Sequence, residues 1–191
     1  MISLAETGIA LRGIGRILRF DRGFLHYFDR SRAGAGRSFW MAAVFLPVFM
    51  IRFYVLHDPR DLPIDGRMLA SVLIAYAINW MAFPLVLLGL GPLLKREAQV
   101  IGTIAVYNWL SLLLILLNVP IILLALIGLD WSILQLLDLA TFLVALICEG
   151  YILAIALQIP GLSAAALVML DFILGQLVFS LADRMGAASL F

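Results

Sequence analysis

The sequence predicts an all-α, polytopic membrane protein in which five transmembrane helices follow an amphipathic, basic N-terminal helix. Of the 191 residues, 64% are hydrophobic and only 13% are charged, and the mean hydropathy is +1.11. Soluble domains are about half apolar and about a quarter charged, so this composition indicates that lipid surrounds most of the chain. Apolar stretches of about 20 residues, the length that crosses a bilayer, also recur from residue 38 onward.

The N-terminal segment, residues 1–37, is expected to be a cytoplasmic segment because it holds seven of the 13 Lys and Arg residues. Ser3 and Glu6 have the spacing of a capping box, which marks the start of a helix. Three leucines at heptad spacing share one face of this helix: Leu4, Leu11 and Leu18. Three arginines gather on the neighbouring face: Arg12, Arg16 and Arg19.

This pattern is typical of a helix that lies in the headgroup layer, where its arginines contact anionic lipid. Packing against the protein's own cytoplasmic loops or against a partner is an equally good interpretation. Asp21 interrupts the apolar face and Gly23 weakens the helix, so we expect a break near residues 20–23.

The transmembrane domain is expected at residues 38–191, with segments rich in Pro, Gly or charge between the spans. The five spans are predicted at residues 38–56, 68–92, 99–127, 132–157 and 162–183. Each must be a helix, because a segment in lipid has to satisfy its own backbone hydrogen bonds. The third span is longer than a bilayer of about 30 Å requires and contains Pro120, so we expect a tilt or a kink there.

The distribution of Lys and Arg predicts the orientation of the chain. Lys95 and Arg96 return to the side of the N-terminal arginines, and positively charged loops face the cytoplasm. We therefore expect an inner-membrane protein with a cytoplasmic N-terminus and, after an odd number of spans, a C-terminus on the far side. The formal net charge of +1 provides no basic field for nucleic acid.

Two acidic residues stand out inside the predicted spans, because a charge at mid-membrane costs at least ~2.5 kcal/mol. Glu149 lies eleven residues before Pro160 and Asp171 lies eleven residues after it, so an antiparallel pair of helices places both carboxyls at similar depth. If they face inward, they would share a proton or hold a cation. Two protonated acids that hydrogen-bond across an inert bundle would have the same sequence pattern.

A second pair, Arg52 and Asp138, falls near the far side of the first and fourth spans. The two could form an ion pair that fixes the packing of these spans, or each could extend to the interface. Uncharged polar side chains in the spans are expected to make hydrogen bonds between helices rather than to bind a substrate. They are Asn79, Asn108, Ser111, Asn118 and Gln176.

The sequence contains no phosphate-binding loop, no nucleophile elbow and no zinc-protease motif, so we expect no enzyme and no cofactor. The single cysteine, Cys148, can form neither an internal disulfide nor a multi-cysteine site, and we expect no metal centre.

Two runs have a familiar pattern: GFLHYFDRSRAGAGRSFWMAAVFLPVF at residues 23–49 and REAQVIGTIAVYNWLSLL at residues 96–113. With a polar N-terminus, five spans and short loops, the chain resembles the Yip family, the Ypt-interacting membrane proteins of vesicle traffic, in its alphaproteobacterial branch. The resemblance covers the chain from about residue 23 to its end and implies a five-span fold.

The leading functional hypothesis is a non-catalytic membrane protein with a structural, membrane-organising or accessory-subunit role. The basic helix and the lack of catalytic motifs favour it, and an accessory subunit would belong to a larger membrane complex. The alternative is a small proton- or cation-coupled transporter or channel that uses Glu149 and Asp171. Because five short helices are expected to enclose little space, such a transporter would act as a homo-oligomer.

Overall fold

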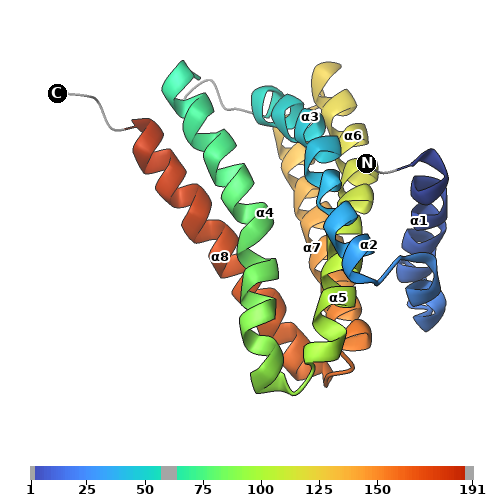
Figure 1. The fold of residues 1–191 in the computed structure, drawn as a ribbon. Helices are drawn as coiled ribbons and strands as arrows, with labels where there is room; N and C mark the ends of the chain where they lie inside the picture. Colours follow the sequence, from blue (N-terminus) through green and yellow to red (C-terminus); the bar gives the residue numbers. More distant parts are fainter. Residues whose placement is uncertain (1–2, 57–63, 188–191) are drawn as a thin grey trace.

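The computed structural model describes residues 3–56 and 64–187, and every element in this part of the chain is helical (Figure 1). Five of its segments are long and apolar enough to cross a membrane. They are Arg32–Val55, Gly66–Leu94, Glu97–Leu126, Trp131–Ala156 and Gly161–Gly186. The predicted all-α, five-span fold is therefore confirmed, and it is the fold of a multi-pass membrane protein.

The spans are built from seven α-helices, and two spans contain a break. The helices are α2 (Arg32–Ser38), α3 (Trp40–Val55), α4 (Gly66–Leu94), α5 (Glu97–Trp109), α6 (Ser111–Leu126), α7 (Trp131–Ala156) and α8 (Gly161–Ala187). The first span begins before residue 38, because Ser31 caps α2: its Oγ accepts a hydrogen bond of 3.0 Å from the N–H of Gly34.

The third span is divided at Leu110, whereas Pro120 lies inside α6. At the division, the Ser111 hydroxyl donates to the carbonyl of Asn108 at 2.8 Å. A serine that bonds back to its own helix competes with the helical hydrogen bonds and bends the chain. The break in this span therefore lies at Leu110, ten residues before the proline.

The helices of the spans form two groups (Figure 1). α4 packs mainly on α8, while α6 packs on α3 and α7. Turns at Lys95 and Gln158 lie at one end of the bundle, called the Lys95 end below, and the turn at Gly128 lies at the other, the Gly128 end. At the Lys95 end the two groups meet in an apolar cluster that includes Phe83, Leu87, Leu153 and Leu157.

Four helix ends close with a residue in the left-handed region. The φ angles are 53° at Phe20, 54° at Lys95, 56° at Gln158 and 81° at Gly128. After each of them a backbone N–H donates to a carbonyl five positions earlier, as in a Schellman motif. Only one of the four positions has a glycine, the residue that adopts this conformation without a steric penalty.

Gly128→Ala should therefore lower the free energy of unfolding by about 1 kcal/mol, and Lys95→Gly should raise it by about 0.5–1 kcal/mol. Detergent-titrated unfolding of the purified protein measures both changes. Equal and same-signed effects of the two substitutions would contradict a backbone origin.

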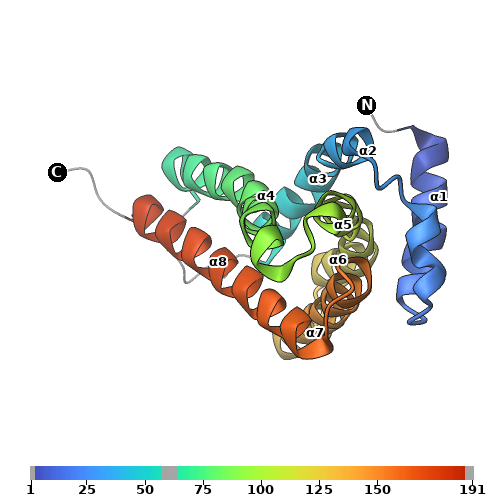
Figure 2. The same cartoon turned by 60° about the horizontal axis from the view of Figure 1, so that its bottom comes forward.

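The N-terminal helix α1 (Leu4–Ile17) runs along the side of the bundle, and Figure 2 shows it there from below. It contacts the short 3-10 helix η1 (Arg22–Tyr27) and the spans α6 and α7. Of the two interpretations of this helix, packing on the protein's own chain is observed, on the flank of the spans as well as on η1. The expected break near residues 20–23 separates α1 from η1.

The buried part of the apolar face of α1 lies beside the leucines that were predicted to contact lipid or a partner. Ala10, Ile14 and Ile17 are at most 1% exposed, whereas three leucines point outward: Leu4, Leu11 and Leu18 are 93%, 41% and 45% exposed. The face with the smaller side chains is buried because it can approach Phe28 closely. A Cβ on Gly13 would lie 2.7 Å from the ring of Phe28, so only glycine fits this contact.

The three arginines predicted to contact lipid, two in α1 and Arg19 just after it, have different surroundings. Arg12 and Arg19 are exposed, as contact with lipid headgroups would require. Arg16 instead pairs with Asp21, and its guanidinium lies 5.2 Å from the ring centre of Tyr27. The Gly23 N–H and Arg16 together lower the pKa of Asp21. Asp21 therefore compensates the charge of Arg16, while contact of the three arginines with lipid headgroups stays a prediction.

Candidate functional site

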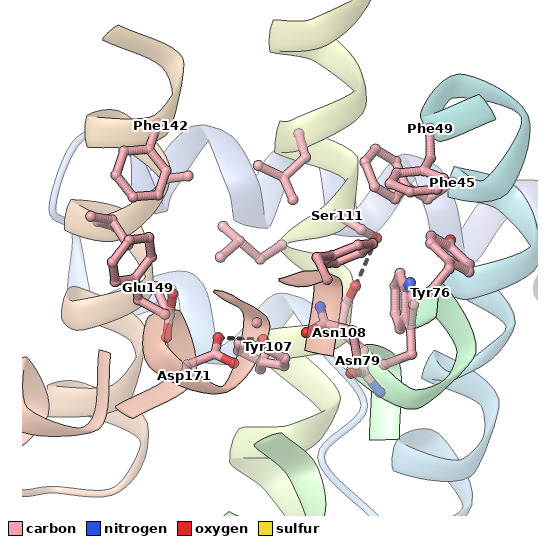
Figure 3. Close-up of a pocket in the computed structure, with 18 of the residues that line it drawn as sticks. Phe45, Phe49, Tyr76, Asn79, Tyr107, Asn108, Ser111, Phe142, Glu149 and Asp171 are labelled. Carbon is pink, nitrogen blue, oxygen red and sulfur yellow. Dashed lines mark hydrogen bonds between the residues drawn. The ribbon is translucent and has the colours of Figure 1, made fainter. Parts of the chain in front are cut away.

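A cavity of about 490 Å³ lies between the two groups of helices, and all five spans line it (Figure 3). This volume is typical of small-molecule sites, which measure about 300–1,000 Å³. The charged or amide side chains in its lining are Arg52, Asn79, Asn108, Glu149, Asp171 and Gln176. A single copy of the chain lines this space with all five spans, and whether copies associate stays a prediction.

Glu149 on α7 and Asp171 on α8 face the cavity together. The turn at Gln158 makes α7 and α8 antiparallel neighbours, so their two carboxyl groups lie at similar depth on adjacent helices. Figure 3 shows both at one edge of the cavity. Glu149 is only 7% exposed, and its Oε1 has no hydrogen-bond partner among the described residues.

Asp171 differs from Glu149 because it has a donor. The hydroxyl of Tyr107 on α5 donates to Asp171 Oδ2 at 2.6 Å, and the Tyr107 ring packs on Phe83 with 5.0 Å between ring centres. The carboxyl pair is therefore asymmetric: one acid is held by a phenol, and the other presents a free oxygen.

Arg52 on α3 and Asp138 on α7 form an ion pair near the Gly128 end. Arg52 lines the cavity, while Asp138 lies outside its lining. Because Asp138 compensates the guanidinium, the charge that the cavity presents comes from the two acids.

The uncharged polar residues divide into three kinds. Asn108 joins two helices, since its Nδ2 donates to Ser38 Oγ at 2.9 Å, while its buried Oδ1 has no partner in the described part of the chain. Asn79 and Gln176 line the cavity. Ser111 and Asn118 donate to the carbonyls of Asn108 and Leu114 in their own span, because short polar side chains reach carbonyls three or four positions back.

The aromatic part of this site was not predicted from the sequence. Eight aromatic side chains line the cavity: Phe45, Phe49, Tyr76, Trp80, Tyr107, Phe142, Phe172 and Phe179. One signal was available for Tyr107. It lies ten positions after Glu97, the start of α5, and Asp171 lies ten positions after Gly161, the start of α8 at the same end of the bundle. Equal depth alone could therefore have paired Tyr107 with Asp171.

A comparison of the chain with protein-family models, with curated proteins and with solved structures found no match. The resemblance to Yip proteins therefore stays a prediction, and function has to be inferred from the site. In residues 3–56 and 64–187, no three His, Cys, Asp or Glu side chains form a cluster that could hold a metal ion.

Proposed function

We propose that this chain is an inner-membrane transporter that binds a proton or a monovalent cation at Glu149 and Asp171. One observation supports this proposal above all. The buried Oε1 of Glu149 lacks a hydrogen-bond partner among the described residues and faces a cavity beside a second carboxyl. In this proposal the chain moves a solute and catalyses no reaction.

The chemistry of the pair favours a bound ion or proton. Two carboxylates in a low-dielectric interior cannot both stay charged without compensation, so the pair holds a proton or attracts a cation. In an inert bundle, buried polar groups satisfy each other. Here Tyr107 satisfies only Asp171, and the oxygen of Glu149 is left for a ligand.

The surroundings of the pair favour access from one side. The lining extends from Glu149 and Asp171 to Arg52 and Phe179 towards the Gly128 end. At the Lys95 end, the apolar cluster of Phe83 and its neighbours closes the bundle. With a cytoplasmic N-terminus, as the Lys and Arg distribution predicts, the site would open to the far side. Transport then requires a second state in which that cluster separates.

The competing proposal is the structural or accessory role that the sequence alone favours. The docked α1, with its outward leucines and exposed Arg12 and Arg19, is compatible with that role. The two proposals differ in one respect: a structural protein needs no carboxyl in its cavity and moves no solute.

Flux through proteoliposomes distinguishes them. With an imposed pH or cation gradient, the wild-type chain should give flux that Glu149→Gln and Asp171→Asn each reduce by at least about 10-fold, since one ionisable group of the pair is lost. Asp183→Asn is the matched control, because it removes an exposed carboxyl from the same helix outside the cavity. It should leave flux within about 2-fold of wild type.

Folding of each variant is checked by gel filtration before reconstitution. Folded wild-type protein with no gradient-driven flux of protons, Na⁺, K⁺ or organic ammonium ions would contradict the transporter and favour the structural role. Equal loss of flux in Asp183→Asn and Glu149→Gln would contradict the assignment of the site.

A further inference from the structure

We propose that the cavity binds a protonated organic amine with an apolar body, and that at least one N–H of the amine donates to Glu149. This inference rests on the proposed function, because it names the class of cation that the same site takes. Three features support it: the size of the cavity, its aromatic walls and the unpartnered oxygen at one edge.

The cavity is too large for a bare ion. A volume of about 490 Å³ is many times the share of one water molecule, about 30 Å³ in the liquid. Ca²⁺ and Mg²⁺ also take six or more oxygen ligands at short distance. Glu149, Asp171 and Tyr107 provide two carboxyls and a phenol gathered at one edge, which leaves the rest of the space for a larger molecule.

The aromatic side chains form two walls. Phe142 and Phe172 contact each other on α7 and α8 beside the acids, with 5.5 Å between ring centres. Across the cavity, Phe49 packs on Tyr76 at 4.7 Å and on Phe179 at 6.1 Å (Figure 3). Aromatic faces attract cations and also bury apolar groups, so these walls suit the body of an organic cation.

The acids orient the molecule and set its charge. An ammonium group with an N–H satisfies the free Oε1 of Glu149, whereas a quaternary ammonium has no hydrogen to donate. The lining presents no uncompensated positive charge against it, because Asp138 neutralises Arg52. The amine thus places its charged end on the carboxyl pair and its apolar end against Phe49 and Tyr76.

Calorimetric binding to the purified full chain tests the inference with matched probes. The probes are 2-phenylethylammonium, its N,N,N-trimethyl analogue, the neutral 2-phenylethanol, Na⁺ and K⁺. The primary ammonium should bind with a Kd at least about 10-fold lower than those of the trimethyl analogue and the alcohol. Glu149→Gln should raise this Kd by at least about 10-fold, and Asp183→Asn should leave it within about 2-fold.

A second variant keeps both acids and changes only a wall. Phe142→Leu retains an apolar side chain but removes an aromatic face beside the acids, where the charged end lies. It should weaken binding of the ammonium about 3- to 10-fold while changing that of the alcohol less. Equal binding of the ammonium and the alcohol, or an unchanged affinity in Glu149→Gln, would overturn the inference.

The outcomes separate this inference from the proposed function. Flux of protons, Na⁺ or K⁺ that depends on Glu149, without binding of the ammonium, would overturn the inference and leave the transporter proposal intact. Binding of the ammonium that depends on Glu149, without any flux, would support the inference and contradict transport. Neither binding nor flux would overturn both.

Discussion

Gly34→Ala is expected to lower the free energy of unfolding by about 2–3 kcal/mol, because overpacking against fixed backbone is strongly destabilising. A Cβ at Gly34 would overlap the carbonyl and carboxyl groups of Asp29. Gly36 belongs to the same short helix α2, and a Cβ there would meet nothing within 4 Å. Gly36→Ala is therefore the matched control and should be neutral or stabilising by up to about 1 kcal/mol.

The contact at Gly34 belongs to a tight turn that leads into the first span. Asp29 Oδ1 accepts from the N–H of Ser31 at 3.0 Å, and Arg37 donates to Asp29 Oδ2 at 2.7 Å. These bonds, first the one from the Ser31 backbone, lower the pKa of Asp29. On the other side of the turn, a Cβ at Gly102 of α5 would lie 3.0 Å from Cβ of Arg30. Because Gly34 and Gly102 have no side chains, the turn at residues 29–31 fits between α2 and α5.

Unfolding in a detergent titration, followed by far-UV circular dichroism, measures both alanine variants. The large effect should be confined to Gly34. A loss of the same size in Gly36→Ala would indicate that helix propensity or lipid contact, rather than the Asp29 turn, sets the stability of α2.

The spans could be predicted well because lipid imposes a simple requirement on each of them. A segment such as α7 must be about 20 residues long, apolar and helical, and all three properties are visible along one stretch of sequence. Turn residues then mark the ends: Lys95 and Gln158 lie between spans in the sequence and in the structure.

The rotation of each helix could not be predicted from the sequence. α1 has two candidate apolar faces, and the leucine face is the larger by side-chain volume. The face of Ala10 and Ile14 is buried because Gly13 allows close approach to Phe28, a residue beyond the end of α1. The residues of α1 alone do not predict the contact between Gly13 and Phe28, since it depends on how the chain turns at Phe20.

In the candidate site, too, the depth of a residue could be predicted from the sequence but the rotation of its helix could not. The equal depth of Glu149 and Asp171 follows from counting residues to Pro160, which needs only the helical rise. Whether two acids at equal depth face each other depends on rotation, and the contribution of Tyr107 depends on the position of a third helix. Likewise, Gly34 and Gly36 are indistinguishable in the sequence, and only the path of residues 29–31 makes one of them indispensable.

Arg52→Met and Asp138→Leu should each lower the free energy of unfolding by about 2–3 kcal/mol, because each leaves the other partner as an unpaired charge within a span. The two side chains are 33% and 40% exposed, so the effect should be smaller than the 3–5 kcal/mol typical of fully buried pairs. The double variant should lie within about 1 kcal/mol of wild type, since apolar side chains replace both charges together.

The double-mutant cycle measures the coupling directly, and the charge-reversed variant Arg52→Asp/Asp138→Arg is a further control that should recover part of the loss. Arg184→Met removes an exposed arginine in the last turn of α8 and should change stability by less than about 0.5 kcal/mol. If the two single losses simply added in the double variant, the pair would not hold α3 against α7. Each charge would then be stabilised separately at the membrane interface, and the position of α3 would depend on its packing against α6 and on the aromatic contacts of Phe49.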